Sequence, residues 1–319
     1  MTLLSASQSD PDLAQEAFGR RLASRVAERE SQIVLGLDPD PGQLWPGCDA
    51  GGAGTPAQRA AAAVQAHCCA LIDAAGPACV AVKPQLACFE RLGKDGRQAL
   101  SATVEHAKQA GLLVVADGKR GDIDVTARAY AQSLFGGLQT PFGAVEGLGA
   151  DLATVNPLMG ADAIEPFLAQ ARACQAGVLL LVRTSNPGAA DIEDLQLADG
   201  GTVWERAAAL VHRLGDGSAG SDGIADVGAV MGATVPAHLV RARELMPHAP
   251  FLLPGVGAQG GRIEDLLPAF APGRAGALVS ASRSIAGAHL QHGGSPAQAA
   301  RDEAERMRAA AWDLSGRSS

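Results

Sequence analysis

Charged side chains of opposite sign alternate within one short segment of this 319-residue chain, Asp117-Gly-Lys119-Arg-Gly-Asp122-Ile123. Asp117 and Lys119 are two residues apart, so in an extended backbone their side chains point to the same side. Asp122 follows three residues later, where the chain is expected to turn. An ammonium group between two carboxylates stays protonated and positioned, as a proton donor to a carbanion must be. The same carboxylates would repel a substrate carboxylate that has to leave.

Eight short apolar runs supply the elements that would position these side chains. Each run has four to six residues and is unbroken rather than alternating, which indicates strands buried on both faces of a parallel sheet. The runs are Ile33–Leu37, Cys79–Val82, Leu112–Ala116, Leu152–Val155, Gly177–Val182, Val227–Met231, Pro250–Leu253 and Gly276–Val279.

Alanine-rich stretches with helical character separate the runs. They are Pro56–Ala75, Gln98–Ala110, Ala161–Cys174, Trp204–Leu214 and Pro236–Leu245. Strands that alternate with helices indicate right-handed β–α–β units. Eight such strands favour an α/β fold with a closed (β/α)8 barrel, the TIM barrel, over the alternative of an open doubly wound sheet.

The remaining segments predict how the chain is organised around one barrel domain. We expect a flexible N-terminus over residues 1–12, the barrel over residues 13–294, and a C-terminal helix and tail over residues 295–319. A helix over Phe18–Arg29 would lead into the first strand. Extended loops are expected at Gly42–Thr55, Gly136–Gly149, Gly188–Gly201 and Gly215–Asp226, where Gly, Pro and polar residues gather.

In a (β/α)8 barrel, the active site forms at the carboxyl ends of the strands. Polar residues follow the runs at Asp38, Lys83, Asn156, Arg183–Gly188 and Ser282–Ser284. Since Asp and Lys are rarely buried without a partner, charges of both signs at one rim would offset part of each other's desolvation cost. A structural salt-bridge network is the alternative, but such a network has no need to gather at the barrel mouth.

A glycine-rich segment, Gly255-x-Gly257-x-x-Gly260, follows the seventh run. As a bare string it is similar to a dinucleotide-binding fingerprint, but it lies late in the chain and no acidic residue follows over Arg274–Ser282. A glycine-rich loop after strand seven and Arg283 after strand eight fit instead the phosphate site common in barrels. Glycine allows close backbone approach, and a guanidinium group binds phosphate oxygens. A plain turn with an exposed arginine is the alternative.

Composition narrows the classes of partner. The formal net charge of −8 argues against nucleic acid or an anionic membrane surface as the main partner. No run of about 18 apolar residues occurs and the N-terminus does not have the pattern of a signal peptide, so we expect a cytoplasmic protein. None of the six cysteines forms a C-x-x-C pair, which predicts buried free thiols. The nearest approach to zinc-ligand spacing, His289 and His292, is interpreted as part of a solvated tail.

The whole set of motifs resembles the orotidine 5′-phosphate decarboxylases. The run Asp117-x-Lys119-x-x-Asp122-Ile123 with Thr126 is similar to the signature of that family. The resemblance spans about residues 18 to 287 and extends, in the right order, to Leu37-Asp38, Lys83, Ser185–Gly188, Pro254–Gly261 and Arg283–Ile285. The stretches VKPQLACFERLG and TVNPLMG resemble the longer bacterial-type branch. The resemblance implies a lyase of pyrimidine biosynthesis that makes uridine 5′-phosphate (UMP) from orotidine 5′-phosphate without metal or cofactor.

The resemblance also implies a role for each matched residue of the charged set. Lys119 would protonate C6 of the pyrimidine as CO₂ departs. Asp117 and Asp122 would flank Lys119, and Lys83 would complete an alternating charged array. Asp38 and Lys83 would hold the ribose hydroxyl groups.

Residues of the later loops would bind the rest of the substrate. The resemblance implies that Ser185 forms a hydrogen bond with the pyrimidine. It implies that Gly257, Gln259 and Arg283 bind the phosphate, in a loop that opens at Pro254. The segments that could close over the substrate are Gly188–Gly201 and Gln259–Gly261.

In the resembled family, the residues matched by Asp122, Ile123 and Thr126 reach into the site of the neighbouring subunit. The resemblance therefore implies a homodimer with two shared sites. This chain departs from the family pattern at Asp124, where Gly or Pro is usual. A carboxylate at this position could alter the loop or its local charge.

Three other functions are alternatives to this one. A metal-dependent sugar-phosphate aldolase or decarboxylase on the same barrel resembles a pattern with an acid where this chain has Lys83, and a lysine repels Mg²⁺. A catalytically inactive nucleotide-binding homologue is disfavoured by the intact set Lys83, Asp117, Lys119 and Asp122. A fused second activity would need more chain than the barrel leaves over.

Overall fold

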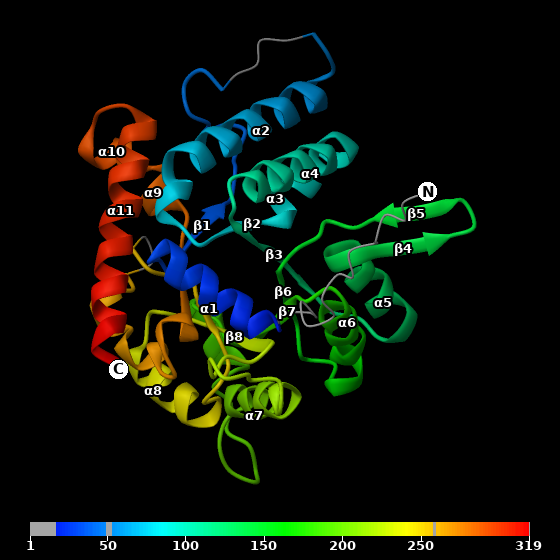
Figure 1. The fold of residues 1–319 in the computed structure, drawn as a ribbon, viewed down its shortest axis with the longest axis vertical. Coiled ribbons are helices and arrows are strands. Elements are labelled where there is room, and N and C mark those ends of the chain that lie inside the picture. Colours follow the sequence, from blue (N-terminus) through cyan, green and yellow to red (C-terminus); the bar gives the residue numbers. More distant parts are fainter. Residues whose placement is uncertain (1–16, 49–52, 258–259, 319) are drawn as a thin grey trace, which may run out of the picture.

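The computed structural model describes residues 17–48, 53–257 and 260–318. Eight parallel strands close into a barrel in the order β1-β10-β9-β8-β7-β6-β3-β2 (Figure 1). The strands are β1 (Ile33–Leu37), β2 (Ala81–Pro84), β3 (Leu113–Arg120), β6 (Leu152–Val155), β7 (Gly177–Arg183), β8 (Val227–Met231), β9 (Phe251–Leu253) and β10 (Ala277–Ala281). The predicted (β/α)8 barrel is confirmed, and the open sheet is excluded because β10 pairs with β1.

Helices connect the strands and surround the barrel (Figure 1). The longer ones are α1 (Phe18–Arg29), α2 (Pro56–Ala75), α4 (Gly93–Gln109), α5 (Asp124–Ala131), α6 (Ala161–Ala173), α7 (Val203–Gly215), α8 (Pro236–Leu245) and α11 (Pro296–Ser315). The shorter ones are α3 (Leu86–Glu90), α9 (Arg283–Ala286) and α10 (Ala288–His292). Within the described ranges, no helix combines the length and apolar character needed to cross a bilayer.

Two helices that return the chain to the barrel begin at capping boxes. Thr55 accepts a hydrogen bond from the Gln58 N–H at the start of α2, and Thr202 accepts one from the Glu205 N–H at the start of α7. The Gln58 and Glu205 side chains bind the backbone N–H of the capping threonines in return. Each box satisfies backbone N–H groups that the first helical turn leaves free, which fixes the residue at which the helix begins.

The amino-terminal end of the barrel is closed by α1. Phe18 of α1 belongs to the same apolar cluster as Val34 and Leu278, whose side chains come from strands of the barrel. Arg21 of α1 donates to Asp151, the residue before β6, at 2.5 Å. With this end sealed by packing, the carboxyl ends of the strands form the open end of the barrel, where enzymes of this fold hold their sites.

The structure contains all eight predicted strands in the predicted order, but three of them are longer than expected. β10 continues to Ala281, β3 continues past Ala116 to Arg120, and β7 continues to Arg183. In β3 and β7 the burial weakens over the last residues, because the chain leaves the core for the barrel mouth. The predicted helices Phe18–Arg29, Pro56–Ala75 and Pro236–Leu245 match α1, α2 and α8.

The prediction of a loop over Gly136–Gly149 is wrong. This segment contains an antiparallel hairpin of β4 (Gly137–Thr140) and β5 (Gly143–Glu146), which projects from the barrel beside α5 (Figure 1). The Thr140 hydroxyl accepts from the Phe142 N–H at 3.1 Å and donates to the Gly143 carbonyl at 2.7 Å, which closes the turn. Both strands are largely exposed, so they lack the alternating burial that a sequence pattern can reveal.

The interpretation of His289 as part of a solvated tail is also wrong. His289 lies in α10, and its ring centroid is 6.5 Å from that of Trp45. The Trp45 indole N–H donates to the Ala286 carbonyl at 2.8 Å, which brings the β1–α2 loop against this region. Residues 1–12 lie outside the described ranges, and the division of the chain at residues 12 and 294 stays a prediction. The helix expected from residue 295 onward is present as α11, which packs against α2.

Candidate active site

A cavity of about 350 Å³ opens at the carboxyl ends of the barrel strands. Its volume falls in the range of small-molecule sites, about 300–1,000 Å³. Seven residues that were predicted to act on the substrate line it, and they come from six different strands or the loops that follow them: Asp38, Lys83, Asp117, Lys119, Ser185, Pro254 and Arg283.

Asp117 lies between two lysines at the floor of this cavity. Lys83 Nζ is 2.7 Å from Asp117 Oδ2, and Lys119 Nζ is 2.6 Å from Asp117 Oδ1. The Lys83 and Asp117 side chains are buried, whereas the Lys119 side chain is 43% exposed and faces the cavity. Within one chain the array is therefore ammonium, carboxylate, ammonium, with Lys119 as the member that a bound molecule can reach.

The electrostatic balance of the array keeps Asp117 ionised. Burial by itself would raise the pKa of this carboxyl group, but the charges and hydrogen bonds of Lys83 and Lys119 outweigh that effect and lower the pKa to about 2. Thr154 in β6 adds a hydrogen bond to Asp117 Oδ1 at 3.0 Å. A permanent negative charge thus lies beside Lys119 at neutral pH.

The backbone of β3 is distorted where it carries Lys119. The register between β3 and β6 shifts between Ala116 and Arg120, and Lys119 adopts a φ of 47°. A non-glycine residue in this left-handed region costs of the order of 1–3 kcal/mol, a cost that is found mainly at functional sites. The Thr154 hydroxyl accepts from the Lys119 N–H at 2.9 Å, which holds the distorted residue in place. The bulge turns the Lys119 ammonium group back onto Asp117.

Asp122, Ile123 and Thr126 do not line the cavity of their own chain. Asp122 Oδ1 accepts from the Ile123 N–H at 2.8 Å, and Thr126 is exposed on α5. The structure therefore brings Lys83, Asp117 and Lys119 together, and it leaves the second predicted carboxylate at the entrance to α5.

The expected phosphate end of the cavity is formed by the loop after β9 and the start of α9. Gly255, Val256, Arg283 and Ser284 line it. Gly257 adopts a φ of 76°, which glycine reaches without strain, and a side chain at this position would lie 3.2 Å from Ser284 Cβ. The Arg283 side chain is exposed at the rim. Gln259, the other residue predicted here, lies outside the described residues.

Comparison with known proteins agrees with this geometry. The model of the family described as "Orotidine 5'-phosphate decarboxylase / HUMPS family" matches residues 31–302. An orotidine 5′-phosphate decarboxylase of Rhodopirellula baltica is 40% identical over 275 residues, which cover 85% of this chain and 89% of that protein. One from Deinococcus radiodurans is 40% identical over 269 residues, covering 84% and 88%.

A solved structure extends the comparison to three dimensions. The orotidine 5′-monophosphate (OMP) decarboxylase of Leishmania donovani matches 93% of this chain and 99% of its own chain, with a TM-score of 0.68 and 32% sequence identity. The chain belongs to the orotidine 5′-phosphate decarboxylase / HUMPS family. The match from residue 31 to residue 302 includes every strand of the barrel and every residue that was predicted to act on the substrate.

The departure from the family pattern at Asp124 is compatible with the observed backbone. Asp124 is the first residue of α5 and adopts a φ of 46°. Glycine reaches this region freely, and Asp is among the residues that tolerate it best. Its carboxylate also lies in the first turn of a helix, where negative charge is favourable. Asp124 therefore tolerates the conformation that glycine would adopt here and places one more acidic side chain in the first turn of α5.

Three polar residues that line the cavity were not among the predicted strand ends: Gln85, Thr154 and Ser280. Four more belong to predicted strand ends but were assigned no role of their own: Thr184, Asn186, Ser282 and Ser284. The residue type could have identified Thr154, because it is the polar residue of an otherwise apolar strand and a buried hydroxyl needs a hydrogen-bond partner. Ser284 Oγ is buried and has no hydrogen-bond partner among the described residues, so it can bind a ligand at the phosphate end.

Proposed function

We propose that this chain decarboxylates orotidine 5′-phosphate to uridine 5′-phosphate, as its family relatives are named to do. The observation that carries this proposal is the Lys83–Asp117–Lys119 array at the floor of the cavity, with a cationic residue, Arg283, at the rim. A cavity of this kind accepts an anionic substrate at one end and presents an ammonium group to the reacting carbon at the other.

The array can perform the reaction without an electron-accepting cofactor. When the bond between C6 and the carboxyl carbon breaks, its electron pair stays on C6 and CO₂ leaves. The Lys119 ammonium group then donates a proton to C6, and the neutral amine recovers a proton from solvent. Asp117 orients that ammonium group and repels the substrate carboxylate, so its charge destabilises the bound substrate relative to the transition state.

A metal-dependent reaction on the same barrel fits these residues less well. Both carboxylate oxygens of Asp117 already accept from ammonium groups, Oδ2 from Lys83 and Oδ1 from Lys119. A divalent cation prefers carboxylate and carbonyl oxygens and is repelled by a neighbouring ammonium group. Among the residues that the structure describes, no group of three or more His, Cys, Asp or Glu side chains is arranged to hold a metal ion.

A direct assay separates these possibilities. Purified protein is mixed with orotidine 5′-phosphate in EDTA, and the pyrimidine absorbance is followed. Conversion to uridine 5′-phosphate at the same rate with and without EDTA is the expected result. A folded protein that converts no substrate would favour the inactive nucleotide-binding homologue, and activity that returns only with Mg²⁺ would favour the metal-dependent reaction.

Removal of the guanidinium group at residue 283 is expected to reduce turnover as well as binding. Phosphate binding far from C6 can offset distortion and desolvation at the reacting carbon, so Arg283→Ala is expected to lower kcat/KM by roughly 10²-fold or more, with part of the loss in kcat. Steady-state kinetics with the full substrate measure this. Arg262, which is exposed and pairs with Glu264, supplies a matched control variant, Arg262→Ala, with little expected effect. Unchanged kcat and KM in Arg283→Ala would contradict the phosphate assignment.

The active form is proposed to be a homodimer in which α5 of one subunit completes the site of the other. Two observations support this proposal. Asp122 and Thr126 lie outside the cavity of their own chain. Around the mouth, Ile123, Val125 and Leu158 expose apolar side chains, and α5 packs beside α6, which follows Leu158. Exposed apolar groups at one place indicate a surface that another protein covers.

The cytoplasmic location stays a prediction. All six cysteines are free thiols, which is compatible with a reducing compartment.

Mixed dimers test the shared site. Lys119→Ala and Asp122→Ala are each expected to be nearly inactive alone. If one subunit supplies Lys119 and the other Asp122, unfolding and refolding the two variants together restores about a quarter of the wild-type activity, because half of the dimers are mixed and each has one intact site. Activity is measured before and after mixing at equal protein concentration. No recovery in dimers that have exchanged subunits would contradict sharing.

A further inference from the structure

The chain that carries Ser185 into the cavity is weakly supported by apolar packing. Residues 187–201 separate this segment from α7, and the structure describes all of them; only Ala189 is buried. Ile192 and Leu195 in the same stretch are 59% and 53% exposed. The position of Ser185 must therefore depend on contacts other than burial in the core.

A second cavity lies behind this segment. Its volume is about 600 Å³, and its lining includes Thr184, Asn186 and Glu193 together with Leu181 and Trp204. Thr184, Asn186 and Glu193 therefore border unfilled space, which leaves this segment with less side-chain packing than a core position has.

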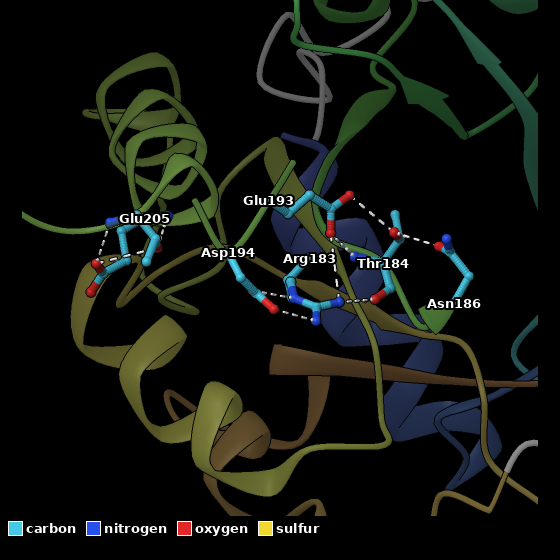
Figure 2. Close-up of polar contacts among 7 residues, drawn as sticks. Arg183, Thr184, Asn186, Glu193, Asp194 and Glu205 are labelled. Carbon is cyan, nitrogen blue, oxygen red and sulfur yellow. Dashed lines mark hydrogen bonds and ion pairs between the residues drawn. The ribbon is translucent and has the colours of Figure 1, made fainter. Parts of the chain in front are cut away.

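Polar contacts from Arg183, Glu193 and Asp194 hold the segment instead (Figure 2). Glu193 Oε2 accepts from the Thr184 N–H at 2.8 Å, and Glu193 Oε1 lies 2.9 Å from the Thr184 hydroxyl. Arg183 Nη1 donates to the Thr184 carbonyl at 2.6 Å. Both backbone polar groups of the residue next to Ser185 are therefore bound by side chains.

The three charged groups also bind each other. Arg183 donates from Nε and Nη2 to the two carboxylate oxygens of Asp194, both at 2.8 Å, and Arg183 Nη1 is 3.7 Å from Glu193 Oε2. The hydrogen bonds from Arg183 lower the pKa of Asp194. The Arg183 side chain is mostly buried, so loss of either carboxylate would leave its charge poorly compensated.

Glu193 is itself anchored to α7. The Trp204 N–H donates to the Glu193 carbonyl at 2.9 Å, and Trp204 is buried. Ser185 also lies against the residue that follows β8, because a side chain at Gly232 would come within 2.9 Å of Ser185 Cα. The segment is thus held by close backbone contact there and by a polar clamp, which consists of the side chains of Arg183, Glu193 and Asp194.

We infer that Glu193 is a positioning residue for Ser185: through Thr184 it sets where the Ser185 hydroxyl meets the pyrimidine. Glu193 is absent from the lining of the active-site cavity, so it acts through the loop and not on the substrate. The inference rests on the proposed function, because it assigns Ser185 to the pyrimidine. Misplacement by about 1 Å can reduce a rate by 10²-fold, so a group at this distance can matter for turnover.

A double-mutant cycle tests the clamp. Kinetics are measured for the wild type, Glu193→Ala, Ser185→Ala and the double variant. Glu193→Ala is expected to lower kcat/KM by roughly 10-fold or more in the wild type and by less than about twofold when Ser185 is already absent, because coupled residues are not additive. Glu193→Gln, whose amide oxygen can still accept from the Thr184 N–H, is expected to recover part of the loss.

Glu205 provides a matched control. It also lies at the start of α7 (Figure 2), where it binds Thr202 and pairs with Arg241 at 2.7 Å. It makes no hydrogen bond or ion pair to residues 184–186. Glu205→Ala is expected to lower the midpoint of thermal unfolding while leaving kcat/KM within about twofold of the wild type, since its loss removes a cap and not a loop contact.

Binding of uridine 5′-phosphate, measured by calorimetry on the same variants, separates failure of the clamp from failure of the proposed function. If the wild type binds this nucleotide but does not decarboxylate the substrate, the proposed function is contradicted and the clamp is not. The double-mutant cycle of Glu193 and Ser185 is then evaluated from the Kd values for the nucleotide. A wild type that neither binds nor reacts contradicts both proposals. Loss of equal size with and without Ser185, or no loss in folded Glu193→Ala and Glu193→Gln, would overturn the clamp.

Discussion

Lys119→Ala is expected to lower kcat/KM by about 10⁴-fold or more, because the substitution removes both the proton donor and the positive charge that faces the developing carbanion. The remaining lysine of the array cannot replace it, since Lys83 is buried on the far side of Asp117. Single-turnover formation of uridine 5′-phosphate measures the loss without interference from product release. A residual rate within 10-fold of the wild type would contradict the role of Lys119.

The backbone conformation at residue 119 allows a second variant, Lys119→Gly, that separates loss of the side chain from backbone strain. Lys119 has a φ of 47°, which alanine reaches only with strain and glycine reaches freely. Lys119→Gly is therefore expected to be as inactive as Lys119→Ala but more stable by about 1 kcal/mol in urea unfolding. Equal stability of the two variants would indicate that the left-handed conformation is lost together with the side chain. Exposed Lys94 on α4 supplies a neutral comparison, Lys94→Ala, with wild-type kinetics expected.

The barrel could be predicted because its strands are buried on both faces. Runs such as Ile33–Leu37 and Val227–Met231 are apolar at every position and match β1 and β8. The hairpin of β4 and β5 could not be predicted in this way, since its strands are largely exposed and their residues carry no burial pattern. Burial is what hydrophobic periodicity records, so elements that pack on nothing leave little trace in the sequence.

Only part of the active site could be predicted, namely the residues that directly follow the buried strands. Lys83 and Asp117 follow apolar runs, and the carboxyl ends of parallel strands meet at one rim, so their pairing could be expected before the structure. The bulge that turns Lys119 toward Asp117 depends on a hydrogen bond to Thr154, which lies 35 residues away. No local signal in the sequence encodes such a contact between separate strands.

The clamp behind Ser185 is a second case in which contacts between separate segments could not be predicted from the sequence. Arg183 was placed at the end of a strand, but its partners Glu193 and Asp194 lie ten and eleven residues later in a segment that was predicted only as a polar loop. Their pairing requires the path of residues 187–192 to fold back on the strand end. Charge and spacing alone do not specify that path, because a charged pair at this separation is equally compatible with solvent exposure.

Asp117→Asn is expected to lower both the stability of the fold and the activity. The variant leaves the ammonium groups of Lys83 and Lys119 on either side of a neutral amide, at positions where both now lie within 3 Å of a carboxylate. Breaking a buried ion pair costs about 3–5 kcal/mol, and loss of a preorganised charge costs about 10²–10³ in turnover. Urea unfolding and kinetics at pH 7 measure the two losses separately.

The pH dependence of the stability difference between wild type and Asp117→Asn shows whether that difference comes from the charge of Asp117. The pKa of Asp117 is about 2 in the folded chain, below its ordinary value of 3.8. The charge of Asp117 therefore stabilises the fold by about 2 kcal/mol above pH 4, and this stabilisation is lost as the pH falls toward 2. The stability gap between wild type and Asp117→Asn should therefore narrow over that range, while carboxyl groups common to both proteins cancel. Thr154→Val removes the hydrogen bond that the hydroxyl donates to Asp117 and the one that it accepts from the Lys119 N–H. It is expected to cost about 1–3 kcal/mol and to retain the pH dependence of the wild type, because Asp117 keeps both lysines. A gap of constant width from pH 7 to pH 2 would show that the array contributes to stability through shape and not through the charge of Asp117.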